Sequence, residues 1–171
     1  HGKELAKYVY LDRDCCAHSI LAWWQKNWLP DVVLKLDPFH VIQRFNSAAA
    51  KNGGPKATSY NQIVSSFKAH FWRESEGDKI ELAKVVREAR PSLDGYDSAL
   101  SWAKAHLADY PKVVRRYIPP ADELLKSLEE FRQKWEDFED LEGHKVLHEK
   151  ATKALNEACA HASRGCLSDP V

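Results

Sequence analysis

Short apolar runs alternate with an amphipathic segment in the first fifty residues. Residues 8–11 and 32–36 are apolar runs rich in β-branched and aromatic side chains, and residues 17–28 between them carry apolar side chains at helical spacing. Short apolar runs on either side of a helical segment predict a βαβ unit with two parallel strands. The crossover in such a unit is almost always right-handed and sets the strands side by side or nearly so. A second helix is predicted over 38–51.

The rest of the chain has a helical pattern. Residues 52–55, with two glycines and a proline, form the clearest break. Apolar positions then recur at helical spacing in five segments, which are 58–73, 80–90, 96–107, 119–135 and 144–163. We therefore predict a mostly α fold with a small parallel βαβ element, in which 1–52 form a βαβα segment and 56–171 a helical bundle packed on it. Two strands leave their edges unpaired, so we expect helices or a second chain to cover them.

Charge and composition limit the classes of function. Lys plus Arg and Asp plus Glu number 25 each, so the formal net charge is zero with His neutral. Binding to nucleic acid would therefore need a local basic patch rather than a global attraction. No apolar run approaches the ~20 residues of a membrane span, and no signal peptide is visible. The spacing of the four cysteines fits no disulfide framework, so we expect reduced thiols in an intracellular protein, nuclear if the source is eukaryotic.

Acidic side chains follow both predicted strands. Asp12 comes directly after 8–11, with Asp14 two residues further on, and Asp37 comes directly after 32–36. Parallel strands end at the same edge of a sheet, where open α/β sheets build their sites. Two carboxylates held close repel each other unless a proton or a metal lies between them, and carboxylate oxygens suit Mg²⁺. However, Asp37 followed by proline is also a standard helix start, and Asp12 and Asp14 could simply be the polar end of a strand.

The motifs around these aspartates resemble the catalytic core of DDE-type transposases and transposon-derived proteins. They read YVYLDRDCC at 8–16 and LKLDPFHVIQRF at 34–45, and the tail AHASRGCLSDP at 160–170 is similar to a segment that precedes the final catalytic part of those proteins. The resemblance implies a partial RNase H-like core with a helical insertion bundle. It also implies DNA as a partner and Mg²⁺ or Mn²⁺ as cofactors for metal-dependent cleavage and transfer of DNA strands.

The resemblance also implies roles for single residues. Asp12 would be a strand-end metal ligand, with Asp14 as its less favoured substitute. Asp37 would be a supporting acid of the D-x-F-H motif, and His40 and Arg44 would support that motif. A partly buried histidine bonded to the backbone is the alternative for His40.

We expect the 171-residue chain to be inactive by itself and to hold metal weakly or not at all. The resemblance places one essential aspartate before residue 1 and the essential glutamate after Val171. The parent protein could be an active transposase or a domesticated one, and a homo-oligomer could cover the strand edges. Two alternatives stay open. One is a non-catalytic helical interaction domain, and the other is a small zinc-binding module with ligands from Cys15, Cys16, His18, Cys159, His161 and Cys166.

Basic and histidine side chains supply the remaining candidates. Lys112, Arg115 and Arg116 form a local cluster of the kind that contacts nucleic-acid phosphates. A second basic stripe is interleaved with glutamates, which favours a solvated helix face with ion pairs; it consists of Lys84, Arg87 and Arg90. His144 and His148 are spaced by one helical turn, and we interpret them as exposed histidines on a surface helix.

Overall fold

The computed structural model describes residues 7–11, 20–28, 30–50 and 57–167. The chain divides into two compact units, of which the first comprises residues 1–71 and 119–171 and the second residues 72–118. Eight helices and four short strands lie within the described ranges. None of these helices has the length and apolar character that a membrane crossing requires. The prediction of a mostly α fold with a small parallel sheet is confirmed.

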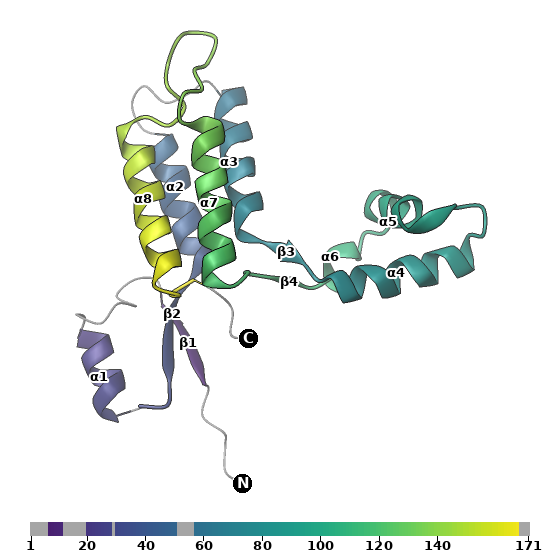
Figure 1. Ribbon diagram of the computed structural model, residues 1–171, viewed down its shortest axis with the longest axis horizontal. Helices are drawn as coiled ribbons and strands as arrows, with labels where there is room; N and C mark the ends of the chain where they lie inside the picture. Colours follow the sequence, from purple (N-terminus) through teal and green to yellow (C-terminus); the bar gives the residue numbers. More distant parts are fainter. Residues whose placement is uncertain (1–6, 12–19, 29, 51–56, 168–171) are drawn as a thin grey trace. The chain divides into compact units, whose positions relative to one another are not determined.

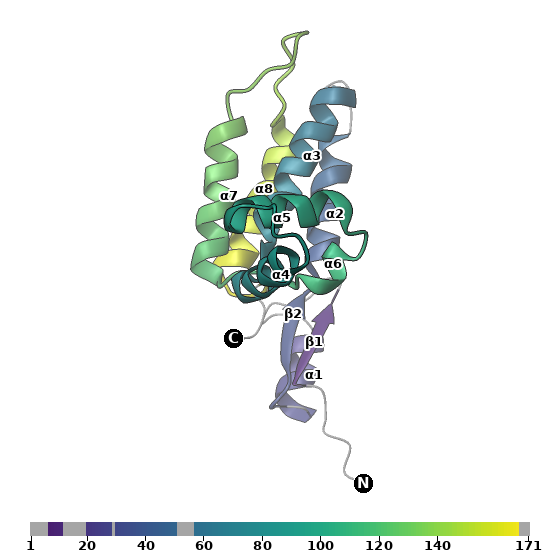
Figure 2. The same cartoon turned by 90° about the vertical axis from the view of Figure 1, so that its right-hand side faces the viewer.

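Four helices of the first unit pack side by side as a bundle (Figures 1 and 2). They are α2 (Pro38–Ala49), α3 (Ala57–Phe71), α7 (Ala121–Trp135) and α8 (Glu149–Ser163). The rings of Phe45 and Phe67 stack with their centroids 3.8 Å apart, and Phe131 lies edge-on to both, at 5.6 and 5.2 Å. All three rings are fully buried. Because aromatic side chains bury the largest apolar areas, this cluster dominates the core of the bundle.

A parallel pair of strands leads into the bundle. β1 (Tyr8–Leu11) pairs with β2 (Val33–Leu36), in a register that runs from Tyr8 opposite Val33 to Leu11 opposite Leu36. Helix α1 (Ile20–Trp28) lies between them in the chain. The predicted strand, helix and strand are thus confirmed in order and in direction.

The strand pair is only partly covered. Leu36 is fully buried, whereas Val9, Tyr10 and Val33 are exposed. Within the described ranges, β1 and β2 pair only with each other. Parallel sheets normally have both faces covered, so the cover that we expected over this pair stays a prediction.

The end of α8 is bonded to β2. The backbone N–H of Leu36 donates to the carbonyl of Cys166 at 2.8 Å, and Lys35 Nζ donates to the carbonyl of Gly165 at 2.7 Å. Gly165 has a φ of 69°, a left-handed conformation that commonly ends helices. Since α2 begins directly after β2, the start of α2 and the end of α8 both lie at the carboxyl end of this strand.

The second unit is a helical hairpin with a short ribbon. It contains α4 (Glu76–Ala89), α5 (Gly95–His106), the short α6 (Tyr110–Val113), and the antiparallel strands β3 (Arg73–Glu74) and β4 (Arg116–Tyr117). Its core is small and is formed by Leu82, Ala83, Val86, Ala99, Ala103, Tyr110 and Val114. The sequence did not predict the ribbon or α6, because elements of two to four residues leave no periodic pattern.

The last helix begins later than predicted. We expected it from residue 144, but α8 starts at Glu149. Residues before it form a hairpin-like loop in which Glu139 bridges Lys145. Asp140 Oδ1 accepts hydrogen bonds from the backbone N–H groups of Glu142 (2.9 Å) and His144 (3.0 Å). This side chain competes with the helix for the backbone donors, so the prediction that placed His144 on a helix is wrong.

The two units cut across the domain boundary that we drew from the sequence. The first unit contains residues on both sides of the predicted division at 52–56, and it also contains 119–171. The segment 72–118 separates from both neighbours as a unit with its own core. The assignment of 1–52 and 56–171 to an RNase H-like part and an insertion stays a prediction.

Candidate functional site

The two parallel strands end side by side at Leu11 and Leu36. One residue further on, the backbone N–H of Asp37 donates to the carbonyl of Leu11 at 2.8 Å. The backbone of Asp37 therefore lies at the carboxyl edge of the pair, next to the end of β1. Open α/β sheets bind their ligands at this edge, so it is the first place to look for a site.

Asp37 is the N-cap of α2. Its Oδ1 accepts a hydrogen bond from the backbone N–H of Phe39 at 2.8 Å, and Pro38 fills the first turn. The cap interpretation of the Asp-Pro pair is confirmed. The second oxygen, Oδ2, lies 3.7 Å from Nε2 of His40, and both side chains are partly exposed, at 37% and 36%. The cap therefore uses one carboxylate oxygen and leaves the other beside an imidazole.

His40 and Arg44 follow Asp37 at intervals of three and four residues, so the three lie along one face of α2. Arg44 is exposed. The charge of Arg44 acts on His161, which lies on α8. The pKa of His161 is lowered mainly by burial, then by the charge of Arg164 and then by that of Arg44. His161, which we considered only as a zinc ligand, is thus within the electrostatic influence of Arg44.

The carboxylates predicted at the end of the first strand, Asp12 and Asp14, lie outside the described residues, so their pairing with Asp37 stays a prediction. The same holds for the zinc candidates before residue 20, which are Cys15, Cys16 and His18. The two cysteines at the other end, Cys159 and Cys166, are buried free thiols. Burial raises the pKa of the Cys159 thiol, which disfavours the thiolate that zinc requires.

Each member of the predicted nucleic-acid cluster has an acidic partner within the second unit. The pairs are Lys112 with Asp109 at 2.7 Å, Arg115 with Asp78 at 2.8 Å and Arg116 with Glu74 at 3.6 Å. Arg115 makes the strongest of these contacts, because its Nε and Nη2 donate to the two carboxylate oxygens in a bidentate fork. These side chains balance acids of their own unit. Their role as nucleic-acid contacts stays a prediction.

The pKa values of two acidic side chains in these ion pairs, Glu74 and Asp78, are lowered, which is the direction that ion pairing requires. Hydrogen bonds from Arg115 hold the pKa of Asp78 well below its ordinary value. Burial by itself would raise the pKa of Glu74, but hydrogen bonds from Lys104 and Tyr110 outweigh burial and lower it. The network joins β3, α4, α5 and β4, so we assign it a structural role.

One group with metal-ligand chemistry was not predicted. Asp140, Glu142 and His144 each offer a ligand atom, and these atoms lie within 4.8 Å of one another. The D-x-E-x-H spacing was the available signal, and we missed it because we had assigned His144 to a helix with His148. Instead, His148 is the N-cap residue of α8 and its Nε2 lies 3.4 Å from the carbonyl of Ala49. Asp140 already organises its own loop through two backbone hydrogen bonds, and this accounts for its burial.

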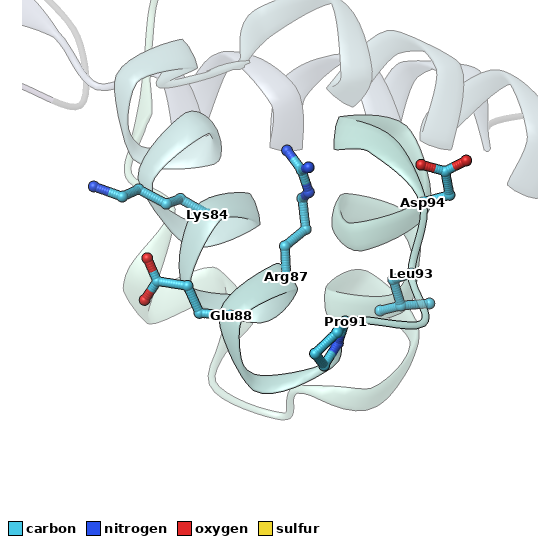
Figure 3. Close-up of a pocket in the computed structure, with 6 residues that line it drawn as sticks. All are labelled: Lys84, Arg87, Glu88, Pro91, Leu93 and Asp94. Atoms are coloured by element: carbon cyan, nitrogen blue, oxygen red, sulfur yellow. The ribbon is translucent and has the colours of Figure 1, made fainter.

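A shallow depression of about 380 Å³ lies on the second unit, between α4 and the turn that follows it (Figure 3). It is lined by Lys84, Arg87, Glu88, Pro91, Leu93 and Asp94. Two cations and two anions line it, and Arg90, the third member of the basic stripe, lies over the ring of Trp102 at 4.2 Å. This mixture of charge agrees with our interpretation of the stripe as a solvated face.

No family model, no curated protein and no solved structure matches this chain. The residues and their geometry, together with the motifs at 8–16 and 34–45, therefore have to indicate the function.

Proposed function

We propose that this chain is part of a transposase-derived, RNase H-like DNA-processing protein in which Asp12 and Asp37 hold a divalent cation. One observation supports the proposal most directly. The parallel strands end side by side, and the N–H of Asp37 is bonded to the carbonyl of Leu11, the residue that precedes Asp12 in the sequence. The motif resemblance adds the class of reaction, which is phosphoryl transfer on DNA.

Asp37 fits this role through the oxygen that the helix cap leaves available. Oδ1 is held by the N–H of Phe39, so the carboxylate is fixed in orientation and Oδ2 is its remaining cation ligand. His40 Nε2 lies 3.7 Å from Oδ2. Bound Mg²⁺ or Mn²⁺ would stabilise the attacking and leaving oxygens of a phosphoryl transfer. Because Mg²⁺ gives up its water shell reluctantly, we expect two carboxylates to bind it weakly.

The test is a titration of the 171-residue chain with Mn²⁺. The electron paramagnetic resonance signal of free Mn²⁺ measures how much of the metal is bound at each step. A background of Glu142→Gln and His144→Gln removes the loop cluster as a competing site. We expect Asp12→Asn and Asp37→Asn each to weaken binding at least tenfold. Asparagine caps helices about as well as aspartate, so Asp37→Asn should retain the fold, which circular dichroism checks.

The matched control is Asp31→Asn. Asp31 is exposed and precedes β2, at the opposite end of the strand from Asp37. We expect this variant to bind Mn²⁺ like the background protein. Equal binding by Asp31→Asn and Asp37→Asn would contradict the proposal.

A second candidate is a non-catalytic interaction domain. Large apolar side chains are exposed on α1 and at the start of α2, with Trp23 at 62%, Trp28 at 68% and Phe39 at 65%. Exposed aromatic side chains are common at protein interfaces. This candidate would be favoured if Mn²⁺ binding did not depend on Asp12 or Asp37.

A further inference from the structure

We propose that the exposed ring of Phe39 is a stacking platform for an unpaired base of a nucleic-acid strand whose phosphate lies at the strand edge that carries Asp37. The choice of nucleic acid rests on the proposed function, in which Asp37 holds a cation that acts on phosphate. The place of the ring rests on its own contacts and exposure. Phe39 would thus contact a base, whereas the cation at Asp37 acts on the phosphate.

The start of α2 fixes Phe39 beside the carboxylate of Asp37. Phe39 follows Pro38 in the first turn of the helix, and its backbone N–H donates to Asp37 Oδ1 at 2.8 Å. Because this cap bond joins the two residues directly, the backbone of Phe39 is held in place relative to the carboxylate. The side chain of Phe39 therefore starts from a fixed point beside the proposed cation site.

One imidazole contacts both the carboxylate and the aromatic ring. His40 Nε2 lies 3.7 Å from Asp37 Oδ2, and the centroids of the His40 and Phe39 rings are 6.2 Å apart with their planes at 82°. Through this contact the ring stays within a few nucleotides of Oδ2, since one DNA strand rises about 3.4 Å per nucleotide. A strand with a phosphate at the carboxylate can therefore place a nearby base at Phe39.

The ring of Phe39 is open to solvent. Its exposed fraction is 65%, whereas Val41, Ile42 and Phe45 on the same helix are buried. An edge-to-face pair covers at most one face of each ring, so His40 leaves at least one face of Phe39 uncovered. Among the residues that the structure describes, no other ring packs on Phe39. The ring thus takes no part in the core of the bundle, and a ligand can reach it.

A nucleobase fits an uncovered aromatic face beside a phosphate site. Every base has a flat π face, and proteins that bind single strands stack successive bases on aromatic side chains. In an intact duplex the neighbouring base pairs cover these faces, so a ring reaches a base only where the base is unpaired or flipped out of the stack. We therefore expect a preference for single-stranded over double-stranded DNA and little dependence on sequence.

The experiment measures binding of a short fluorescein-labelled single strand of DNA to the 171-residue chain by fluorescence anisotropy, with and without Mn²⁺. A second strand of the same length has no bases but retains every sugar and phosphate. The ratio of the two affinities reports base contacts, because the phosphates are common to both strands. We expect Phe39→Leu to lower this ratio at least about fivefold, which corresponds to roughly 1 kcal/mol of lost stacking.

The choice of substitution separates stacking from simple apolar contact. Leucine is a large apolar side chain without a π face, so a site that needs only apolar contact would tolerate Phe39→Leu. Phe39→Trp retains a π face and should keep the affinity ratio of the unchanged protein. The inference is wrong if Phe39→Leu keeps that ratio as well, or if neither strand binds under either condition.

The matched control is Trp28→Leu. Trp28 is as exposed as Phe39, at 68%, but it ends α1 and precedes β2, at the opposite end of that strand from Asp37. We expect this variant to change the affinity ratio less than about twofold. Equal losses in Trp28→Leu and Phe39→Leu would overturn the inference, because bases would then contact any exposed aromatic ring.

A second readout locates the base directly. Single thymines of the strand are replaced by 5-iodouracil, which cross-links to an aromatic side chain when it is irradiated in contact with that side chain. We expect mass spectrometry of the digested protein to map the cross-link to the peptide that contains Phe39. The cross-link should be lost in Phe39→Leu and retained in Trp28→Leu. Cross-links that map only to other peptides would show that another residue contacts the base.

A second copy of the chain is the rival occupant of the exposed ring. Light scattering after size-exclusion chromatography measures the mass of the protein in solution. We expect Phe39→Ala to leave this mass unchanged. If the unchanged protein is a dimer that Phe39→Ala dissociates, the ring belongs to an interface between copies and the inference is wrong.

Failure of the stacking platform is distinguishable from failure of the proposed function. Phe39→Leu leaves Asp37 intact, so its Mn²⁺ binding should match that of the unchanged protein. If Asp37→Asn does not weaken Mn²⁺ binding while Phe39→Leu lowers the affinity ratio, the metal site is wrong and the stacking platform stands. If Mn²⁺ binding depends on Asp37 and the ratio does not depend on Phe39, the stacking platform alone is wrong.

Discussion

Asp37 connects the strand pair to the bundle through three of its atoms. Its N–H donates to Leu11, its Oδ1 accepts from the N–H of Phe39, and its carbonyl accepts from the N–H of His40 at 3.2 Å. Only the second of these contacts depends on the side chain. Substitutions at Asp37 can therefore distinguish the contribution of the helix cap to stability from that of the negative charge.

We expect Asp37→Ala to lower the free energy of unfolding by about 1 kcal/mol, because it leaves a first-turn N–H without its cap. Asp37→Asn should change it by only a few tenths of a kcal/mol, since asparagine caps equally well. Urea unfolding followed by circular dichroism measures both. Asp94→Ala is the control, because Asp94 is the N-cap residue of α5 but makes no side-chain cap bond. A large loss in Asp37→Asn would show that the charge, and not the cap, stabilises the fold.

Residue-scale features were predictable from the sequence only where the partners are close in the chain. The cap follows from the Asp-Pro pair and needs two neighbouring residues. The partner of Arg115 is Asp78, 37 residues away in the chain. Lys35 donates to the carbonyl of Gly165, 130 residues away. Hydrophobic periodicity carries no information about such pairs, so the acidic partners of the basic cluster could not be predicted.

At the scale of elements, periodicity predicted the helices of the bundle better than those of the second unit. On α7, four of the five large apolar residues at helical spacing, Leu124, Leu128, Phe131 and Trp135, are buried, and the fifth, Leu125, is partly buried. On α4, Ile80 and Val85 belong to the apolar pattern that predicted a helix over 80–90, but they are 51% and 59% exposed. That helix packs mainly on α5 through a narrow stripe that includes a small residue, Ala83. A helix with one neighbour buries fewer positions than its apolar residues suggest.

The ion pair between α4 and the segment before β4 should make the second unit sensitive to acid. Because the pKa of Asp78 in the folded chain lies below its ordinary value of 3.8, the stability from this pair is fully present above about pH 4 and is lost as pH falls toward the lowered pKa. We expect amide hydrogen exchange in peptides from 76–106, measured on the whole chain and corrected for intrinsic rates, to accelerate over that range. Asp78→Asn should exchange faster at pH 5 and depend less on pH.

The control for this prediction is Asp97→Asn, which alters an exposed acid in the first turn of α5. We expect its exchange to follow that of the unchanged protein. Identical pH profiles for Asp78→Asn and the unchanged protein would show that the fork between Arg115 and Asp78 does not stabilise the second unit.

At the scale of the whole molecule, the second unit is joined to the rest of the chain at two points that lie together. It begins at Trp72 and ends at Ile118, and just inside these ends Arg73 pairs with Tyr117 and Glu74 with Arg116. Paired residues of antiparallel strands have Cα atoms only ~5 Å apart. The aromatic cluster of the bundle and the core of this unit share no residue.

We therefore expect the first unit to fold without the second. In the test variant, an Asn-Gly dipeptide replaces residues 75–115 between Glu74 and Arg116, because such two-residue turns join antiparallel strands at this spacing. Phe67→Ala then probes the bundle core. It should cost about 3–5 kcal/mol, and the cost in the shortened chain should match that in the full chain within ~0.5 kcal/mol. Phe39→Ala, at an exposed ring, should change stability by less than about 0.5 kcal/mol in both. Urea unfolding of the four variants and their two parents measures these values. A shortened chain that lacks a cooperative transition, or a Phe67→Ala cost that differs by more than about 1 kcal/mol between the two chains, would show that the bundle depends on the second unit.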